Sequence, residues 1–221
     1  MLLSACLQCR GDTEQGLLCG GCWAALPWNS TACQRCALPL PDPAQSLCRA
    51  CAHTAPPQSR AQTALIYDET VSPWLLAFKF QRKLELGHSL AAMLSRQLRR
   101  RTQPLPELLL PIPLHGSRLR ARGYNQSGIL TRHLGQQLCI PLREDLLIRS
   151  RATAIQSRAA SAAARRRNLA GAFDGCSSLE GVRIALVDDV ITTGSTIAEA
   201  ARCCLAAGAA SVEAWAIART P

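Results

Sequence analysis

Two adjacent carboxylates and a hydroxyl-rich turn stand close together near the carboxyl end of the sequence. Asp188 and Asp189 follow an apolar run, and after two more residues comes the turn Thr192, Thr193, Gly194, Ser195 and Thr196. Backbone N–H groups of a glycine-containing turn that opens a helix, together with Ser and Thr hydroxyls, can bind a phosphate. Paired carboxylates can accept hydrogen bonds from a vicinal diol, so the arrangement suits a sugar phosphate. Bare α/β scaffolding is the alternative, but a scaffold gives no reason to place two like charges side by side.

The local sequence predicts a strand before the acids and a helix after the turn. Val182 to Val187 is rich in branched apolar residues, as in a strand buried on both faces of a parallel sheet. Thr196, with Glu199 three positions later, fits a capping box, so Thr196 is the predicted N-cap of a helix that stops at Gly208. Ligands of open α/β sheets collect at the carboxyl ends of the strands, where this order of elements places the acids and the turn.

Eight cysteines near the start of the chain form four C-x-x-C pairs, separated by loops of nine, ten and eleven residues. Two such pairs can supply the four thiolates of a tetrahedral zinc site. Sequential pairing predicts one Zn²⁺ on Cys6, Cys9, Cys19 and Cys22 and a second on Cys33, Cys36, Cys48 and Cys51. An interleaved pairing, iron–sulfur clusters and a disulfide framework are the alternatives. Disulfides need an oxidising compartment, and we find no export signal. We therefore predict two structural zinc ions in a double zinc ribbon over residues 1–53.

Length and composition allow one α/β domain plus a small module, because the chain has 221 residues of which 48% are apolar. No apolar run approaches the ~20 residues of a transmembrane helix, so we expect no membrane insertion and a cytoplasmic protein. The net charge is +10, and residues 96–167 carry fifteen Arg against three acidic residues. This arginine-rich part could bind nucleic acid or polyphosphate, with a solvated basic face as the alternative.

The segment between the cysteines and the arginine-rich part predicts the start of the larger domain. Residues 54–62 have the composition of a linker, so the domain is expected to span 63–221. We expect a strand from Thr63 to Tyr67 and helices over Pro73–Phe80 and Leu84–Leu98. Lys79 and Lys83 are the only lysines in a chain that otherwise uses Arg. This suggests that an ammonium is needed at Lys79, although an ordinary surface lysine explains the position equally well.

A second buried strand is predicted over Leu108–Pro113, and an arginine-containing loop follows it. Arg118, Arg120 and Arg122 in that loop offer guanidinium groups that can bind phosphate oxygens through paired hydrogen bonds. Further along the chain we expect a helix over 127–138, a mobile basic loop over 149–168 that could order over a polyanion (a surface helix being the alternative for 159–167), and a last buried strand from Ser211 to Ala218.

The segment V-D-D-V-I-T-T-G-S-T resembles the motif with which type I phosphoribosyltransferases bind 5-phosphoribosyl 1-pyrophosphate (PRPP). The whole chain resembles the ComF/GntX family in the order of its motifs. These are the cysteine pairs, P-I-P-L with R-G-Y-N-Q, R-x-R-A-T and finally V-D-D-V-I-T-T-G-S-T. The resemblance implies a type I phosphoribosyltransferase-like parallel sheet with flanking helices, preceded by a Cys-rich zinc-ribbon module. It also implies that Pro113 to Gln126 contacts pyrophosphate and that Arg149 to Arg166 forms a flexible hood.

This resemblance sets the roles that we predict for the site. Asp188 and Asp189 hold the ribose hydroxyls and, with Arg149 and Arg151 on the leaving pyrophosphate, make up the catalytic set. The predicted PRPP-binding set comprises Lys79, Arg118, Arg122, Gly123, Val187, Thr192, Thr193, Gly194, Ser195 and Thr196. Mg²⁺ is expected to accompany PRPP, since it prefers oxygen ligands and substrate phosphates.

Two functions stay open on the sequence alone. In the first, the chain is a phosphoribosyltransferase, and hence a glycosyltransferase, whose acceptor the sequence does not reveal. In the second, it is a PRPP sensor that binds single-stranded DNA and proteins of an uptake apparatus through its arginines. The resemblance associates either function with natural competence or with the use of DNA as a nutrient. DNA recognition led by the zinc ribbons is weaker, because residues 1–59 carry three Arg against three acids.

Overall fold

We describe a computed structural model of the chain over residues 4–13, 17–151, 171–174 and 178–221. Most of the predicted basic loop over 149–168, including its helical alternative over 159–167, therefore lies outside the described residues.

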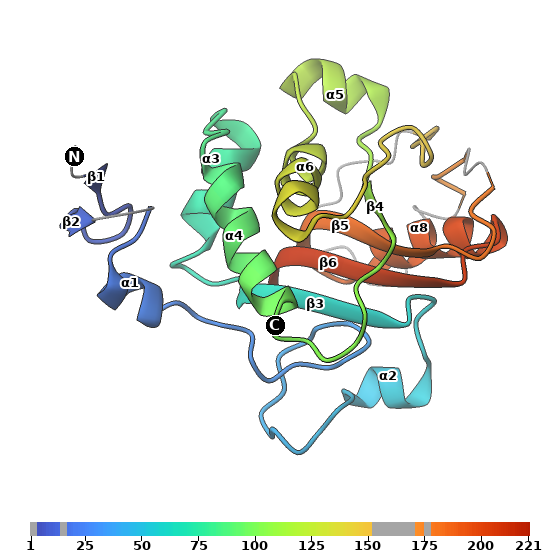
Figure 1. The fold of residues 1–221 in the computed structure, drawn as a ribbon, viewed down its shortest axis with the longest axis horizontal. Coiled ribbons are helices and arrows are strands. Elements are labelled where there is room, and N and C mark those ends of the chain that lie inside the picture. The colour runs from blue at the N-terminus through green and yellow to red at the C-terminus, as the bar shows by residue number, and fades with distance from the viewer. Residues whose placement is uncertain (1–3, 14–16, 152–170, 175–177) are drawn as a thin grey trace.

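Within the described residues, a parallel sheet forms the centre of the larger domain (Figure 1). Its strands lie in the order β3 (Arg60–Ile66), β6 (Ser211–Arg219), β5 (Arg183–Ile191) and β4 (Leu108–Pro111). Every neighbouring pair is parallel, so the carboxyl ends of all these strands meet at one edge. The observed sheet confirms the predicted α/β class.

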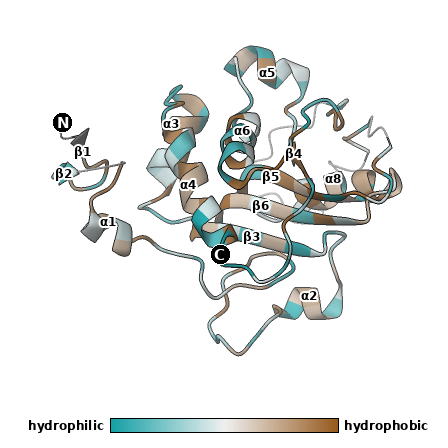
Figure 2. Ribbon diagram, in the orientation of Figure 1, coloured by the Kyte–Doolittle hydropathy of each residue, from teal (hydrophilic) through white to brown (hydrophobic). Residues whose placement is uncertain are grey.

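Helices cover both faces of this sheet, as expected for parallel strands buried on both sides. Helices α4 (Leu86–Leu98) and α6 (Gln126–Leu138) lie on one face, next to α3 (Ser72–Phe80). Helix α8 (Ser195–Ala206) packs on β5 and β6 from the opposite side. Figure 2 shows hydrophobic residues along β5, between the two helical layers.

Strand β5 is buried on both faces, as its run of branched apolar residues predicted. Ala185 and Val187 belong to the core cluster beneath α4 and α6, whereas Ile184 and Leu186 belong to the cluster beneath α8. All four side chains are completely buried. The alternation follows from the two-residue period of a strand.

The N-terminal module contains β1 (Ser4–Ala5), β2 (Asp12–Thr13), α1 (Gly20–Ala24) and α2 (Arg49–His53). The chain between α1 and α2 runs along the outer edge of β3 (Figure 1). There the Asn29 N–H donates to Ala64, the Ile66 N–H donates to Pro27 and the Ala61 N–H donates to Gln34. These bonds occupy backbone groups of β3 that an exposed edge strand would leave unpaired.

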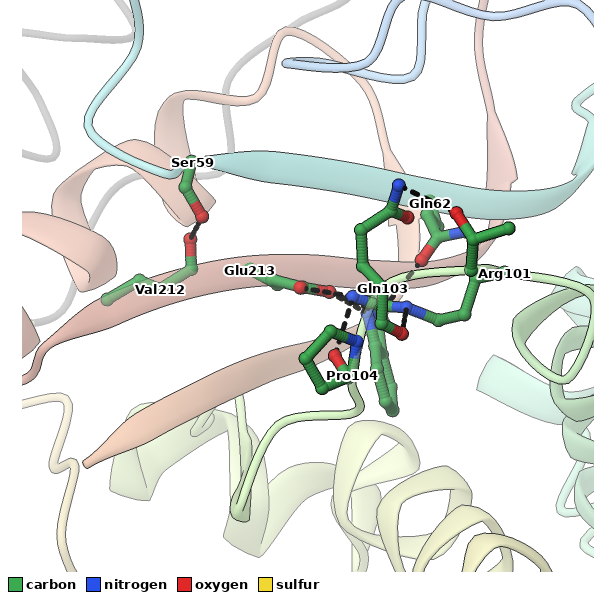
Figure 3. Close-up of polar contacts among 9 residues, drawn as sticks. Ser59, Gln62, Arg101, Gln103, Pro104, Val212 and Glu213 are labelled. Carbon is green, nitrogen blue, oxygen red and sulfur yellow. Dashed lines mark hydrogen bonds and ion pairs between the residues drawn. The ribbon is translucent and has the colours of Figure 1, made fainter.

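At the amino end of the strands, Arg101 connects α4 to the sheet (Figure 3). Its guanidinium donates to both carboxylate oxygens of Glu213 on β6, at 2.7 and 2.6 Å, and to Gln62 on β3 at 3.1 Å. The arginine side chain is 4% exposed. A bidentate arginine–carboxylate pair is both strong and directional, so it fixes the end of α4 against the strands.

The structure changes several predicted boundaries. Strand β3 begins at Arg60, three residues inside the predicted linker, because Ser59 and the residues after it already pair with β6. Strand β5 continues to Ile191, because its pairing with β6 extends to that residue. The loop after β4 contains a short helix, α5 (Gly116–Arg122), that we did not predict. No helix in the described part of the chain is long and apolar enough to span a membrane.

Candidate functional site

The acid pair lies near the carboxyl end of β5, at the carboxyl edge of the sheet. Asp189 is 3% exposed, and its Oδ2 atom lies 2.7 Å from the Nζ atom of Lys79. Lys79 is near the end of α3, so the helix and the strand meet through this ion pair. Burial lowers the pKa of Lys79, but the negative charge of Asp189 and the hydrogen bond to it outweigh burial, and the pKa lies above its ordinary value.

Asp188 has a different set of partners. The Ser127 hydroxyl of α6 donates to its Oδ1 atom at 2.9 Å, and the backbone N–H of Asp189 donates to the same atom at 2.9 Å. Burial and the neighbouring charge of Asp189 raise the pKa of Asp188 to about 7, against the opposing effects of Lys79 and Ser127. Ser127 was not among the predicted site residues, because nothing in the sequence shows that the second residue of α6 faces β5.

The hydroxyl-rich turn connects β5 to α8 and begins immediately after Ile191. Gly194 has φ +75°, in the left-handed region that favours glycine, and it is the N-cap of α8. The Thr193 and Ser195 hydroxyls hydrogen-bond each other at 2.7 Å. Thr192 and Thr193 are exposed, and Thr196 is partly exposed. The turn thus presents hydroxyls and the start of a helix beside the acid pair, the arrangement expected of a phosphate cradle.

The predicted capping box is wrong. Thr196 lies inside the first turn of α8 rather than at its N-cap. Glu199 does not reach back to the start of the helix: one carboxylate oxygen accepts from the Gly171 N–H at 2.7 Å and the other pairs with Arg202 at 2.5 Å. The Glu199 carboxylate is thus bound by Gly171 and Arg202 and does not cap the start of the helix.

Arg149, one of the two arginines predicted for the leaving group, interacts electrostatically with Asp188. Arg149 is 9% exposed, and the centre of its guanidinium lies 5.5 Å from the centroid of the Phe173 ring. Burial and the positive charge of Arg118 lower the pKa of Arg149, and the charge of Asp188 opposes them. Arg149 therefore interacts electrostatically with both Arg118 and Asp188. Arg151 is exposed at the end of the described stretch.

The end of α5 supplies a more peripheral group. Arg122 donates to the Gln126 side chain at 2.5 Å, and its guanidinium lies 4.9 Å from the centroid of the Phe80 ring. Gly123 has φ +85°, and a Cβ atom there would lie 3.0 Å from the Arg82 guanidinium, so the position favours glycine. Arg120 is exposed. These contacts place Arg122 and Gly123 beside the carboxyl end of α3.

Val187 differs from the other residues of the predicted binding set. Its side chain is completely buried in the core, and its carbonyl accepts from the Ile112 N–H at 2.9 Å. The side chain therefore supports the strand beneath the acids and does not face a ligand.

The eight cysteines form two compact groups, and each group is the sequential set that we predicted. Cys6, Cys9, Cys19 and Cys22 form the first cluster, and Cys33, Cys36, Cys48 and Cys51 form the second. Within each cluster the sulfur atoms all lie within 4.8 Å of one another, and none of the eight is in a disulfide. Four thiols that converge in this way fit a tetrahedral zinc ion.

The two clusters pack on different parts of the larger domain. Leu18 and Leu26, near the first cluster, belong to the core beneath α4 and α6. Ala37, directly after Cys36, is completely buried in the core cluster beneath α8. The two ribbons therefore pack against the core on opposite faces of the sheet.

Comparison with known proteins identifies both parts of the chain. Residues 2–52 match the double zinc ribbon domain family. The DNA utilization protein YhgH of Escherichia coli (strain K12) is 35% identical over 97% of this chain and 96% of its own length. Competence protein F of Haemophilus influenzae is 34% identical over the same shares of both chains. Competence protein ComFC of Bacillus subtilis is 30% identical over 70% of this chain and 62% of its own length.

Solved structures of phosphoribosyltransferases are more distant. The glutamine PRPP amidotransferase of B. subtilis has a TM-score of 0.38 at 21% identity and covers 57% of this chain and 26% of its own. The adenine phosphoribosyltransferase of Leishmania tarentolae has a TM-score of 0.36 at 19% identity, over 62% and 58% of the two chains. The full-length relatives, which share both the cysteine-rich module and the larger domain, show that the chain belongs to the ComF/GntX family of competence and DNA utilization proteins.

Proposed function

We propose that the larger domain binds PRPP with Mg²⁺ and transfers its phosphoribosyl group to an acceptor. The observation that carries this proposal is the acid pair at the carboxyl edge of the sheet, which has Lys79 and Ser127 on one side and the hydroxyl-rich turn after the end of β5. Asp189 is buried and paired with Lys79, whereas Asp188 is partly exposed and can accept hydrogen bonds from a ligand. A ribose diol, with its phosphate on the adjacent turn, matches both features.

In this proposal each group of residues binds a different part of PRPP. Asp188 and Asp189 accept hydrogen bonds from the ribose hydroxyls, and the turn from Thr192 to Thr196 holds the 5-phosphate through its hydroxyls and N–H groups. Arg149, which interacts electrostatically with Asp188 and Arg118, binds the pyrophosphate together with Arg118, and Arg151 approaches it from the same segment as Arg149. Lys79 pairs with Asp189 and holds its carboxylate in position. Mg²⁺, bound with the substrate phosphates, supplies additional positive charge at the leaving group.

The chemistry of the transfer follows from these placements. The bond between ribose C1 and the pyrophosphate oxygen breaks, and pyrophosphate leaves with the electron pair. The acceptor, an amine or a nucleobase nitrogen, forms the new bond to C1 and releases a proton to water. Positive charge develops on the ribose ring as the bond breaks, and the carboxylates below it stabilise that charge. The arginines stabilise the charge on the departing pyrophosphate.

The relatives suggest where the reaction belongs. Their names link them to competence and to DNA utilization, so we place this protein in DNA uptake or in the use of DNA as a nutrient. The nucleobases and nucleotides of imported DNA are then the first acceptors to test.

Phe80 favours a second function, in which the protein senses PRPP and binds single-stranded DNA. The Phe80 side chain is 63% exposed, and Leu76, one turn earlier on α3, is 46% exposed. Arg122 stacks on the Phe80 ring, and Arg82 follows directly after α3. An exposed aromatic ring among arginines is the arrangement on which single-stranded nucleic acids stack their bases.

A pyrophosphate-release assay separates the two functions. The purified, zinc-replete protein is mixed with Mg²⁺ and PRPP, and nucleobases, nucleotides and simple amines are added one by one. The transferase account predicts that an acceptor raises pyrophosphate release above hydrolysis and that Asp188→Asn abolishes the increase. PRPP binding without accelerated release by any acceptor, combined with salt-sensitive binding of single-stranded DNA, would favour the sensor.

A further inference from the structure

Arg219 is a buried arginine whose contacts the predicted chemistry does not use. It is the last residue of β6, next to β5 in the sheet, and it is 8% exposed. A guanidinium keeps its charge even where it is buried, so it requires several hydrogen-bond acceptors. The acceptors around Arg219 belong to two segments that are far apart in the sequence.

The first place is the second cysteine cluster. The Nε atom of Arg219 donates to the carbonyl of Cys36 at 3.0 Å, across 183 positions of sequence. The guanidinium also interacts electrostatically with thiols of the same cluster, those of Cys36, Cys48 and Cys33. Four thiolates around one Zn²⁺ keep a net negative charge, because their charges outweigh that of the ion. The loaded cluster therefore stabilises the buried guanidinium.

The second place is the backbone that leads into the phosphate turn. The Nη1 atom of Arg219 donates to the carbonyl of Ile191 at 3.3 Å, and the N–H of Thr220 donates to the same carbonyl at 3.1 Å. Ile191 is the last residue of β5 and directly precedes Thr192. The guanidinium also donates to the hydroxyl of Thr220 at 3.1 Å. The Arg219 side chain thus hydrogen-bonds both to Cys36, a predicted zinc ligand, and to Ile191, the residue directly before the turn.

Packing connects the same two places. Ala37, which follows Cys36, is completely buried in one core cluster with Ile191 and with Ile197 of α8. A change in the backbone around the second cluster must therefore be accommodated by residues on both sides of the turn, because protein cores are densely packed.

From these contacts we infer that Arg219 couples zinc in the second cluster to the geometry of the phosphate turn. Zinc fixes the backbone at Cys36, Cys36 holds one part of the guanidinium, and the remaining part holds Ile191 in place. The first cluster has no equivalent role in this inference, because it packs against the helices on the other side of the sheet. Arg219 is a positioning residue, and its effect on PRPP rests on the proposed function.

Amide hydrogen exchange of the turn tests this coupling without any ligand. The principal variant is Arg219→Lys, which keeps a buried positive charge, but a single ammonium cannot hold Cys36 and Ile191 in the geometry of a guanidinium. Arg101→Lys is the matched control, since it makes the same change in a buried arginine bound to the same strand at its other end. We expect the amides of 192–196 to exchange about tenfold faster in Arg219→Lys than in the wild type. The control should match the wild type in this segment.

Removing each zinc cluster separately tests the direction of the coupling. Cys51→Ala impairs the second cluster and should speed exchange in 192–196, whereas Cys9→Ala impairs the first and should leave it unchanged. The combination Arg219→Lys/Cys51→Ala should add little to either change, because both break one connection. Unchanged exchange in Arg219→Lys, or equal effects of Cys51→Ala and Cys9→Ala, would overturn the inference.

Calorimetric titration with Mg²⁺ and PRPP then separates this inference from the proposed function. If the turn binds PRPP, Arg219→Lys should weaken binding about tenfold, and PRPP should slow the exchange of the turn in the wild type. If the wild type binds no PRPP, the proposed function is wrong, and hydrogen exchange still decides whether Arg219 links the cluster to the turn.

Discussion

The Nζ atom of Lys79 lies 2.7 Å from the Oδ2 atom of Asp189. This ion pair joins α3 to β5, two elements 110 positions apart in the sequence, at the point where two carboxylates stand side by side. The sequence left open whether Lys79 was a surface residue or an ammonium with a purpose, and the geometry supports the second interpretation. Lys79 offsets the repulsion between the acids, and Ser127 donates a hydrogen bond to Asp188.

Replacing Lys79 with methionine should weaken both the fold and the site. Asp189 would keep its charge in a buried place without its partner, which should lower the free energy of unfolding by about 2 kcal/mol. The affinity for Mg²⁺ and PRPP should fall at least about tenfold, because the acids would no longer be held in position. Denaturant unfolding and calorimetric titration measure the two effects.

The chain offers two controls for this change. Lys83 is an exposed lysine whose nearest carboxylate, on Glu85, lies 3.9 Å away, so Lys83→Met should alter neither quantity. Lys79→Met/Asp189→Asn should recover most of the lost stability without recovering PRPP affinity, because no unpaired charge remains. If Lys83→Met destabilises as much as Lys79→Met, the ion pair is not the cause.

Removing the Ser127 hydroxyl should shift the pH dependence of PRPP binding. Ser127 donates to the Asp188 carboxylate and so lowers the pKa of that acid, against burial and the charge of Asp189, which together raise it to about 7. Ribose hydroxyls need an ionised acceptor here, so affinity should rise with pH through this range. In Ser127→Ala the pKa of Asp188 rises further, and the midpoint should move about one pH unit upward.

Calorimetric titration of PRPP between pH 6 and 9 measures this midpoint. At pH 9 the affinity of Ser127→Ala for PRPP should be nearly that of the wild type, because Asp188 is ionised in both proteins. Thr131→Val is the control: it removes another buried hydroxyl of α6, one that donates to the carbonyl of Ser127 rather than to an acid. A downward shift in Ser127→Ala, or the same upward shift in Thr131→Val, would contradict the role given to Ser127.

The sequence was sufficient to predict β5 and the placement of the acids and the turn at its carboxyl end, because both depend on local pattern. A run of branched apolar residues fits a strand with two buried faces, and the order of strand, acids and turn defines the carboxyl edge of the sheet. The cysteine clusters were also correct, because C-x-x-C pairs with short loops leave little freedom in how four sulfur atoms can meet.

The predictions that were wrong or incomplete concern residues whose contacts lie far away in the sequence. The capping box at Thr196 gave way to contacts of Glu199 with Gly171 and Arg202. Ser127 reaches Asp188 across 61 positions, and no rule of residue type shows which face of α6 lies on β5. The start of β3 at Arg60 is likewise set by its pairing with β6 and not by its own composition.

Zinc content should be two ions per chain, and each cluster should be removable separately. Mass spectrometry of the native protein should show one ion fewer in Cys9→Ala and in Cys51→Ala, and none fewer in Cys203→Ala, which changes a cysteine of α8. Chelation should abolish the protection of the N-terminal module from hydrogen exchange, because so short a segment needs the metal to fold. Two disulfides in place of zinc, detected as a loss of free thiols, would contradict the assignment.

The Phe80 ring should contribute to binding of single-stranded DNA if the second function is real. Phe80→Ala should cost about 1–3 kcal/mol of binding free energy, the range for one stacked base, and Arg122→Gln should weaken binding and reduce its salt dependence. Leu205→Ala on α8 removes a different exposed hydrophobic side chain, which is 37% exposed, and should have no effect. Fluorescence anisotropy with a labelled oligonucleotide at several salt concentrations measures all three.

Calorimetric titration of PRPP with Mg²⁺ into the zinc-replete protein, beside Asp188→Asn/Asp189→Asn, tests the central claim most directly. The variant keeps the shape of both side chains and removes their charge, so zinc content and the folded state should persist. The account predicts saturable, Mg²⁺-dependent binding at one site per chain in the wild type and its loss in the variant. No binding by the wild type, or equal binding by both proteins, would contradict it.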